Sequence, residues 1–243
     1  MNRMSLRNQV ALVVGASSGI GRETAVLLAR DGVRVMASAR REDRLRELRD
    51  AVKRDGLSLE YRVADASDSA AMETLARATR EEFGEIDILV YATGTNVPGR
   101  ALNRLTTETW DHMISVNLNG AFYITHAVLP AMRERGRGHL IYIASISGQV
   151  PDVSGAAYQA SKRGMIGLAH AIRVEEKEHG IRTCAILPGL VDTEFMEHRA
   201  VKPPADMLAK ALRPEDVAEA VLAIARLPER VVVPELQILP TVL

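Results

Sequence analysis

The sequence predicts an α/β fold built on one doubly wound parallel sheet. Short apolar, β-branched segments alternate with amphipathic segments from one end of the chain to the other, as expected when helices cross between parallel strands. No internal repeat, low-complexity tract or change in composition marks a linker. A length of 243 residues fits one large domain. We therefore expect residues 1–243 to form a single domain with helices on both faces of the sheet.

The first predicted strand, 9–15, is the apolar run QVALVVG, which ends at a glycine. The helix that follows ends at Gly32, the usual position of a glycine C-terminal cap. By the same reasoning the later strands are expected at 33–38, 57–64, 86–93, 139–145, 181–189 and 230–238. The helices are expected at 20–32, 41–56, 68–83, 107–135, 155–179 and 214–227.

Two of these segments depart from a regular pattern. The long helical region 107–135 is expected to be interrupted near Asn119–Gly120. Residues 190–213 are mixed in period and contain Pro203 and Pro204. They predict a mobile flap over a substrate.

The composition argues against several classes of protein. Lys+Arg and Asp+Glu both total 31, so no net field favours nucleic acid or an anionic membrane. The single cysteine, Cys184, cannot form an internal disulfide and suits a reducing compartment. The start of the chain lacks the apolar run of a signal peptide, no segment approaches a membrane-spanning length, and the histidines form no metal-binding pattern. We expect a cytoplasmic, metal-free protein without nucleic-acid or membrane partners.

Glycines are concentrated in the turn after the first predicted strand, which reads GASSGIG. Such glycines allow a tight turn and the close approach of a pyrophosphate, and the next helix offers free N–H groups to the anion. The spacing is not the general G-x-G-x-x-G, so the pattern alone is weak, but its position favours nucleotide binding over a plain turn. The residues expected at the cofactor here are Gly15, Ser17, Ser18, Gly19, Ile20 and Gly21.

Tyr158 precedes Lys162 by four positions in the segment AYQASKRG. On a helix the two side chains share one face. A lysine cation favours the tyrosinate and so lowers a tyrosine pKa that is ordinarily about 10. So short a pattern can arise by chance, and it needs independent support.

That support comes from the order of several motifs along the chain. The turn GASSGIG, Asn117, Ser145, Tyr158, Lys162 and the pair Pro188–Gly189 resemble, in this order, the short-chain dehydrogenase/reductase family. The resemblance covers essentially the whole chain. It implies a seven-stranded parallel Rossmann sheet, a nicotinamide dinucleotide, and hydride transfer between that cofactor and a carbonyl or alcohol.

Two positions differ from the family's pattern. Val14 stands where the family often has threonine, which removes a hydroxyl contact but changes no chemistry. The sequence YATG at 91–94 replaces the usual NNAG. Gly94 keeps the close backbone approach to the cofactor, whereas the missing asparagine side chains leave the bracing of this turn unexplained.

The resemblance assigns a role to each member of the catalytic set. Tyr158 is the general acid in reduction and the base in oxidation. Ser145 donates a hydrogen bond to the same substrate oxygen. Lys162 holds the nicotinamide ribose and lowers the tyrosine pKa, and Asn117 links Lys162 to solvent through water. Asn119 and Ser147, each two positions further on, remain the alternatives to Asn117 and Ser145.

The second strand is followed by arginines instead of an acid. An NAD enzyme needs a carboxylate at this strand end for the ribose hydroxyls, but Ala39 occupies the position and Arg40 and Arg41 follow. The pattern favours NADP(H), although two arginines at a helix start can also be simply solvated. The other expected cofactor contacts are Asp65, at the adenine, and Gly94, Tyr158, Lys162, Pro188, Gly189, Val191 and Thr193.

The expected function is therefore an NADP(H)-dependent carbonyl reductase or alcohol dehydrogenase for a small or medium hydroxy or oxo compound. One alternative is a 3-oxoacyl-[acyl-carrier-protein] reductase, which would need a basic docking surface near the cleft; Arg100, Arg104 and the cluster 133–137 leave this alternative open. Another is a non-catalytic nucleotide-sensing protein. The apolar C-terminal sequence and the small, apolar face of helix 155–179 indicate an interface between subunits, and the family expectation is a homotetramer or homodimer.

Overall fold

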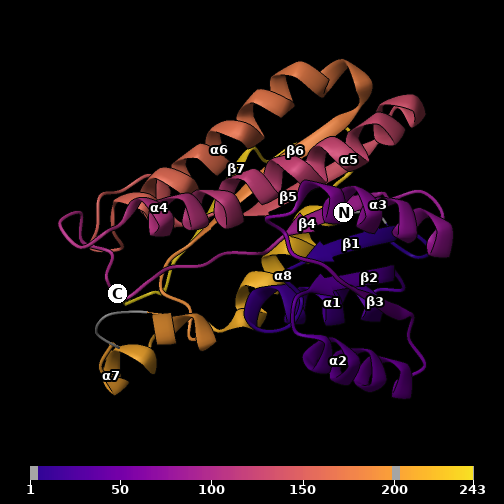
Figure 1. The fold of residues 1–243 in the computed structure, drawn as a ribbon. Coiled ribbons are helices and arrows are strands. Elements are labelled where there is room, and N and C mark those ends of the chain that lie inside the picture. Colours follow the sequence, from indigo (N-terminus) through magenta and orange to yellow (C-terminus); the bar gives the residue numbers. More distant parts are fainter. Residues whose placement is uncertain (1–4, 199–202, 243) are drawn as a thin grey trace.

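A parallel sheet runs through the middle of the molecule (Figure 1). The computed structural model describes residues 5–198 and 203–242. Within these residues seven strands form one sheet in the order β3-β2-β1-β4-β5-β6-β7, and every neighbouring pair is parallel. The strands are β1 (Val10–Val14), β2 (Arg34–Ala39), β3 (Leu59–Val63), β4 (Ile88–Tyr91), β5 (Gly138–Ile143), β6 (Ile181–Pro188) and β7 (Glu235–Ile238). The predicted doubly wound α/β fold is confirmed.

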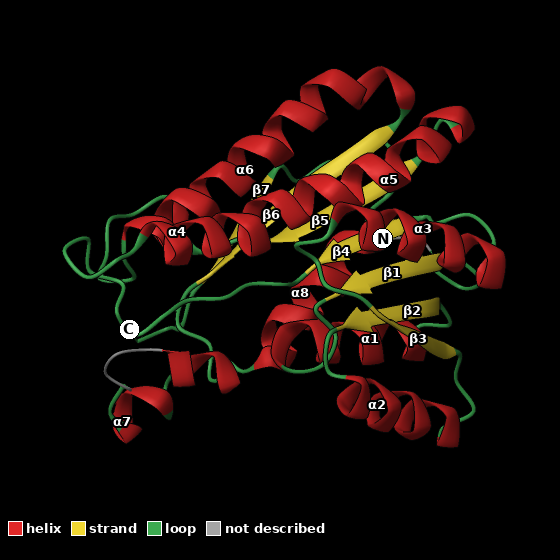
Figure 2. Ribbon diagram, viewed as in Figure 1, coloured by secondary structure: helices red, strands yellow, loops and turns green. Residues whose placement is uncertain are grey.

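Helices cover both faces of this sheet (Figure 2). On one face lie α1 (Gly19–Arg30), α2 (Glu42–Arg54) and α8 (Pro214–Ala225), and on the other lie α3 (Ser69–Phe83), α5 (Gly120–Arg135) and α6 (Ala156–Glu176). Alternate residues of β1 enter the two cores: Val13 packs with the α1 side and Leu12 with the α3 side. A strand that is buried on both faces reads as a continuous apolar run, which explains QVALVVG.

The strands point toward the edge of the sheet near α4 (Thr107–Ile114) and α7 (Ala205–Leu208) (Figure 2). β1 pairs with both β2 and β4, so the order of the strands reverses between β1 and β4. Doubly wound sheets bind their ligands outside the carboxyl ends of the strands at such a reversal.

The regular α-helix is interrupted close to the predicted point, Asn119–Gly120, but the chain does not leave the helix. The chain stays helical from α4 through a π-helical turn, η1 (Ser115–Asn119), into α5. Gly120 gives room to a neighbour instead of ending the helix, because a Cβ there would lie 2.3 Å from Tyr91 Oη. The last strand is also shorter than predicted and begins at Glu235, after Pro234, which has no N–H to donate to a ladder.

The two ends of the predicted flap are held together. Val191 forms a parallel bridge with Leu212, Asp192 N donates to Leu212 O at 2.8 Å, and Leu212 N donates to Leu190 O at 2.9 Å. Between them lie the short helices η4 (Glu194–His198) and α7. Arg199 and Lys202, two cations of this segment, lie outside the described residues.

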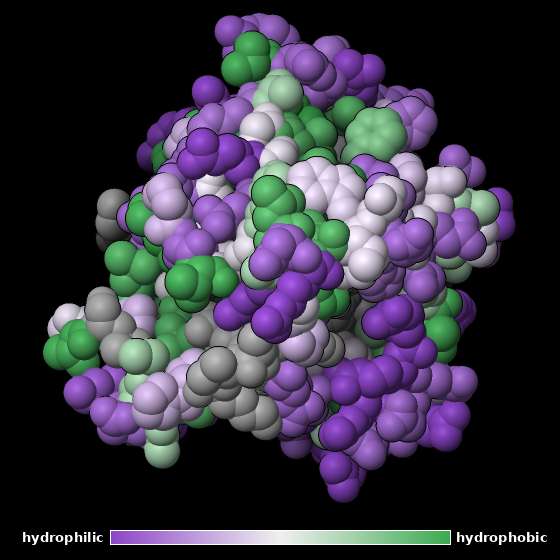
Figure 3. All heavy atoms as spheres, turned by 60° about the vertical axis from the view of Figure 1, so that its left-hand side comes forward, coloured by the Kyte–Doolittle hydropathy of each residue, from purple (hydrophilic) through white to green (hydrophobic). Residues whose placement is uncertain are grey.

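Figure 3 shows the face of the molecule toward which the strands point. Hydrophobic residues there lie between hydrophilic ones. Along the described parts of the chain, we find no helix with both the length and the apolar character required to cross a membrane.

Candidate active site

A cavity of about 830 Å³ opens at the carboxyl edge of the sheet, between the strand ends and the flap. Asn117 and Gly21 do not line this cavity. The other predicted site residues all line it, namely Gly15, Ser17, Ser18, Gly19, Ile20, Arg40, Arg41, Asp65, Gly94, Ser145, Tyr158, Lys162, Pro188, Gly189, Val191 and Thr193. Residues predicted from segments spread over the whole chain therefore line one continuous cavity.

The glycine-rich turn is packed so tightly that side chains would not fit. Gly15 has φ +96°, and a Cβ on it would lie 2.7 Å from the backbone carbon of Ala92. A Cβ on Gly21 would lie 2.2 Å from Gly15 O, so Gly21 shapes the turn from behind. The α1 N-cap residue, Ser18, makes no capping hydrogen bond, and the first N–H groups of α1 are free to bind an anion. These features fit the pyrophosphate of a dinucleotide.

The second basic residue after β2, Arg41, sits beside this turn. Arg41 Nη2 donates to Ser18 Oγ at 2.7 Å and to Ser17 Oγ at 3.1 Å. Ala39 places no acid at the end of β2, and a guanidinium with two hydroxyls suits an additional phosphate. The site therefore fits a dinucleotide that carries a phosphate on its adenosine ribose.

Asp65 follows β3 and lines the cavity near Arg40. Its Oδ1 accepts hydrogen bonds from Ser67 N at 2.9 Å and Ser67 Oγ at 2.7 Å. Burial alone would raise the pKa of Asp65, but these bonds and the nearby charge of Arg40 hold that pKa below its ordinary value. Asp65 is therefore ionised at neutral pH.

Lys162 lies at the opposite, buried end of the cavity. Its side chain is 4% exposed, its Nζ donates to Ile143 O at 2.8 Å, and Nζ lies 5.8 Å from the centre of the Tyr158 ring. Burial lowers the pKa of Lys162 to about 7. A Cβ on Gly94 would lie 3.3 Å from Lys162 Nζ and 3.7 Å from Asn117 Oδ1, so Gly94 keeps the space beside the lysine open.

Asn117 stands behind the cavity on the π-helical turn and is fully buried. Its Oδ1 accepts from Thr95 N at 2.7 Å, and its Nδ2 donates to Thr95 O and to Ser161 Oγ, both at 3.0 Å. Wide π turns occur often at functional sites. Here the turn brings Asn117 onto the loop after β4.

Tyr91 supplies the bracing that the YATG sequence left unexplained. Its buried hydroxyl donates to Val116 O, one residue before Asn117. The loop after β4 is thus tied to the π turn by a tyrosine from β4 and by the asparagine itself. Nothing in the sequence pointed to this partner, because Tyr91 and Val116 lie 25 positions apart.

Ser145 lies two residues beyond β5 and is buried. Its Oγ accepts a hydrogen bond from Ser147 N at 3.2 Å, which does not use the hydroxyl hydrogen of Ser145. The hydroxyl of Ser147, the alternative residue, donates to Asp152 instead. The geometry favours Ser145 as the donor to a substrate. Tyr158, next in this buried group, packs against Phe195 of η4 with the ring centres 5.8 Å apart.

A polar bridge that the sequence did not predict lies in the wall of the cavity. Asp152 accepts from Ser154 N at 2.8 Å, and Asn96 Nδ2 donates to Ser154 O at 3.0 Å. All three residues line the cavity and hold the loops after β4 and β5 together. They belong to no recognisable motif. In the described parts of the chain, no group of three or more histidine, cysteine or acidic side chains is placed to bind a metal.

Comparisons with known proteins agree with this geometry. The family model described as short chain dehydrogenase matches residues 9–203. An uncharacterised oxidoreductase of Staphylococcus saprophyticus is 36% identical over 239 residues, which are 98% of this chain and 99% of the relative.

Solved structures with bound cofactor are also similar to this chain. The closed form of a serine dehydrogenase complexed with NADP+ is 34% identical with a TM-score of 0.87, covering 95% of this chain and 94% of that one. A variant of actinorhodin polyketide ketoreductase with NADPH is 32% identical with a TM-score of 0.88, covering 98% of both chains. Sequence, fold and site agree, and the chain belongs to the short chain dehydrogenase family.

Proposed function

We propose that this protein is an NADP(H)-dependent oxidoreductase that transfers hydride between the nicotinamide and a carbonyl or secondary alcohol of a small or medium substrate. The observation that carries the proposal is that Ser145, Tyr158 and Lys162 line one cavity with the glycine-rich turn and Arg41. A non-catalytic nucleotide sensor has no need of this group.

The preference for NADP(H) rests on the adenosine end of the cavity. Arg41 and two serine hydroxyls form an anion site there, and no acid stands at Ala39 to accept the ribose hydroxyls of NAD. The similar serine dehydrogenase and polyketide ketoreductase structures hold NADP+ and NADPH.

The buried end supplies the acid–base chemistry. When bound, NADPH provides the hydride. Tyr158 gives its hydroxyl proton to the carbonyl oxygen, and Ser145 donates a hydrogen bond to the same oxygen, stabilising the charge that develops there. In the direction of oxidation Tyr158 takes the proton from the alcohol.

Lys162 contributes through its charge and position. Only its cation favours the tyrosinate, and burial holds its pKa at about 7, so the charge of Lys162 changes near neutral pH. We propose that Lys162 holds the nicotinamide ribose, and that Asn117 connects the amine to water across the opening that Gly94 leaves.

The proposal is tested with purified protein, NADPH or NADH, and a panel of ketones, ketoacids and acyl thioesters, following nicotinamide absorbance. Turnover with NADPH on one class of carbonyl supports it; nicotinamide binding without turnover on any class favours the sensing alternative. Preferred turnover of an acyl thioester would favour the 3-oxoacyl-carrier-protein reductase alternative.

A matched pair of serine variants identifies the donor. Ser145→Ala is expected to lower kcat by roughly 10²- to 10³-fold, as expected for the loss of one donor to a developing oxyanion. Ser147→Ala removes a hydroxyl that already donates to Asp152, and it should lower kcat much less than Ser145→Ala does. Equal losses in the two variants would contradict the assignment.

Two further expectations stay predictions. A cytoplasmic location is one. The other is a homotetramer or homodimer, in which the exposed Leu239 and Val242 after β7 would be buried.

A further inference from the structure

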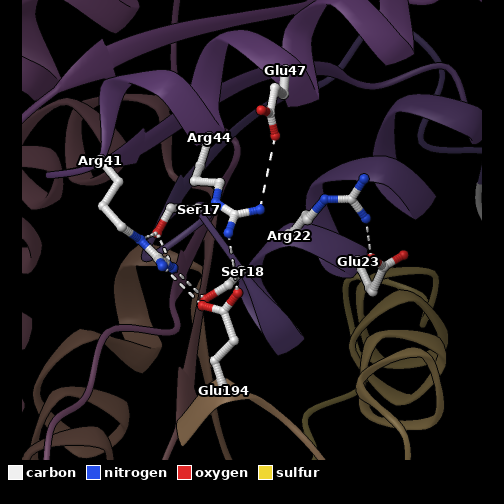
Figure 4. Close-up of polar contacts among 8 residues, drawn as sticks. All are labelled: Ser17, Ser18, Arg22, Glu23, Arg41, Arg44, Glu47 and Glu194. Atoms are coloured by element: carbon white, nitrogen blue, oxygen red, sulfur yellow. Dashed lines mark hydrogen bonds and ion pairs between the residues drawn. The ribbon is translucent and has the colours of Figure 1, made fainter.

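Glu194, the first residue of η4, reaches across the mouth of the cavity to α2. Its Oε2 accepts from Arg41 Nη1 at 2.8 Å, and its Oε1 lies 3.7 Å from Arg44 Nη2. Figure 4 shows the carboxylate facing both guanidinium groups, with Ser18 beside it. The contact joins parts of the chain that are 153 positions apart.

The partners of this carboxylate form a complete site for an anion. Arg41 directs its remaining donors to the hydroxyls of Ser17 and Ser18, so two guanidinium groups and two hydroxyls converge from the glycine-rich turn and α2. The hydrogen bond from Arg41 lowers the pKa of Glu194 and outweighs its slight burial. The site therefore holds an ionised carboxylate that belongs to this chain.

We propose that the Glu194 carboxylate is an internal substitute for the 2′-phosphate of NADP(H) and must release Arg41 when that phosphate binds. The inference rests on the proposed function, since it takes Arg41 as the phosphate ligand. Glu194 then lowers the affinity for NADP(H) but not for NAD(H), whose ribose hydroxyl does not compete for the arginine.

The release also connects the two ends of the cavity. Phe195 follows Glu194 on η4, and its ring packs on Tyr158 with the centres 5.8 Å apart. When Glu194 leaves Arg41, the turn that carries Phe195 loses its hydrogen bond to the start of α2 and keeps only the longer contact with Arg44. Occupation of the phosphate site is thereby communicated to the surroundings of the catalytic tyrosine.

The strengths of the two contacts permit this exchange. The side chains of Arg41 and Glu194 are 44% and 47% exposed. An ion pair between exposed side chains shifts the equilibrium between its formed and broken states by no more than roughly fivefold. A phosphate carries more charge than a carboxylate and offers three strong acceptor oxygens. It is therefore able to displace Glu194.

Calorimetric titration with adenosine 2′,5′-bisphosphate and adenosine 5′-monophosphate isolates the adenosine end from hydride transfer. We expect Glu194→Gln to bind the bisphosphate roughly two- to fivefold more tightly than wild type, with no change for the monophosphate. Glu197→Gln is the matched control, because it removes the same charge from the same helix and, within the described residues, Glu197 forms no ion pair. Unchanged or weaker binding of the bisphosphate by Glu194→Gln, or an equal gain in the control, overturns the inference.

Hydrogen exchange of the amides in 194–198 gives a second measurement. The bisphosphate should accelerate exchange in wild type, and Glu194→Gln should exchange faster even without ligand; slower exchange in wild type upon binding contradicts the release of Glu194. Arg41→Ala distinguishes a failure of the proposed phosphate site from a failure of the proposed role of Glu194. If that variant keeps the wild-type preference for the bisphosphate, the proposed phosphate site is wrong; if it loses the preference while Glu194→Gln is unchanged, only the present inference fails.

Discussion

The two ends of the cavity differ in burial and in charge. At the end proposed for catalysis Lys162 is 4% exposed and Asn117 is fully buried, and backbone carbonyl and amide groups of Ile143 and Thr95 hold them. At the phosphate end the side chains of Arg41 and Glu194 are nearly half exposed and are held mainly by other charged or hydroxyl side chains. Backbone groups of the fold hold the side chains of the first region in position. The side chains of the second region are held by solvent-exposed charged groups.

This difference matches the work that each end is proposed to do. A proton transfer needs groups that are already in position, in surroundings where electrostatic interactions are strong. A cofactor must bind and leave, which suits contacts that water and salt weaken. Changes at the buried end should therefore alter the rate of the reaction, and changes at the exposed end should alter the choice of cofactor.

The largest effect is expected from Tyr158→Phe. Removing a positioned acid–base group should lower kcat by at least roughly 10²- to 10⁴-fold, while NADPH binding, measured by fluorescence titration, should stay near the wild-type value. A folded Phe variant with near-normal turnover would falsify the assignment of Tyr158 as the acid–base group. The buried end would then no longer be the part of the cavity that sets the reaction rate.

A smaller, selective effect is expected from Arg41→Ala. Charge-assisted hydrogen bonds to a phosphate contribute about 1.5–3 kcal/mol, or roughly 10- to 150-fold in affinity, so kcat/KM for NADPH should fall in that range and kcat/KM for NADH should hardly change. Arg40→Ala is the neighbouring control and should cost less, because the serine hydroxyls bond to Arg41.

Replacing Ala39 tests the same end in the opposite direction. Ala39→Asp adds an acceptor for the ribose hydroxyls of NADH and repels the 2′-phosphate, so the preference between the cofactors should invert. Equal losses of kcat/KM for both cofactors in Arg41→Ala, or a wild type that prefers NADH, would contradict the assignment of this end.

The buried amine should make stability depend on pH. Burial holds the pKa of Lys162 at about 7 in the folded protein, whereas an exposed lysine side chain has a pKa of 10.5. Between these two pH values the unfolded chain therefore binds more protons than the folded protein. The stability of the folded protein consequently rises with pH over this range. Lys162→Met removes this dependence. Without cofactor, the gain in Tm of the variant over wild type should be largest below pH 7 and shrink toward pH 10. A constant difference across that range would show that the amine is not held in a low-dielectric environment.

The smallest effect concerns the bracing behind the catalytic end. Tyr91→Phe leaves Val116 O without the tyrosine hydroxyl and should lower the free energy of unfolding by about 1–3 kcal/mol, measured by urea denaturation, with a moderate loss of kcat. Tyr142→Phe is the matched control, since the buried Tyr142 hydroxyl bonds to Thr125 of α5 at 2.7 Å, away from the cavity. A similar loss of kcat in both variants would mean that Tyr91 only stabilises the core.

The sequence was sufficient for the fold, and all of its predicted site residues except Gly21 and Asn117 line the cavity. Strands buried on both faces leave apolar runs, and parallel strands carry their following loops to one edge, so Ser145 and Gly15 could be placed together without coordinates. The partners of Glu194 and Tyr91 could not be predicted, because such contacts join distant positions and follow no period. The register of the π turn, which gives Asn117 its direction, was likewise invisible in the residue pattern.

The bridge between Val191 and Leu212 has a consequence for how this enzyme can change. Its hydrogen bonds close the base of the flap next to β6, so the two ends of the segment that carries η4 and α7 are held together. Lengthening a segment whose ends are held together has only a small entropic effect, and the sheet, whose strand ends line the cavity, lies on the other side of the closure. Insertions or deletions in the middle of this segment, away from Glu194 and Phe195, are therefore expected to change the shape of the cavity mouth while the strand ends stay in place.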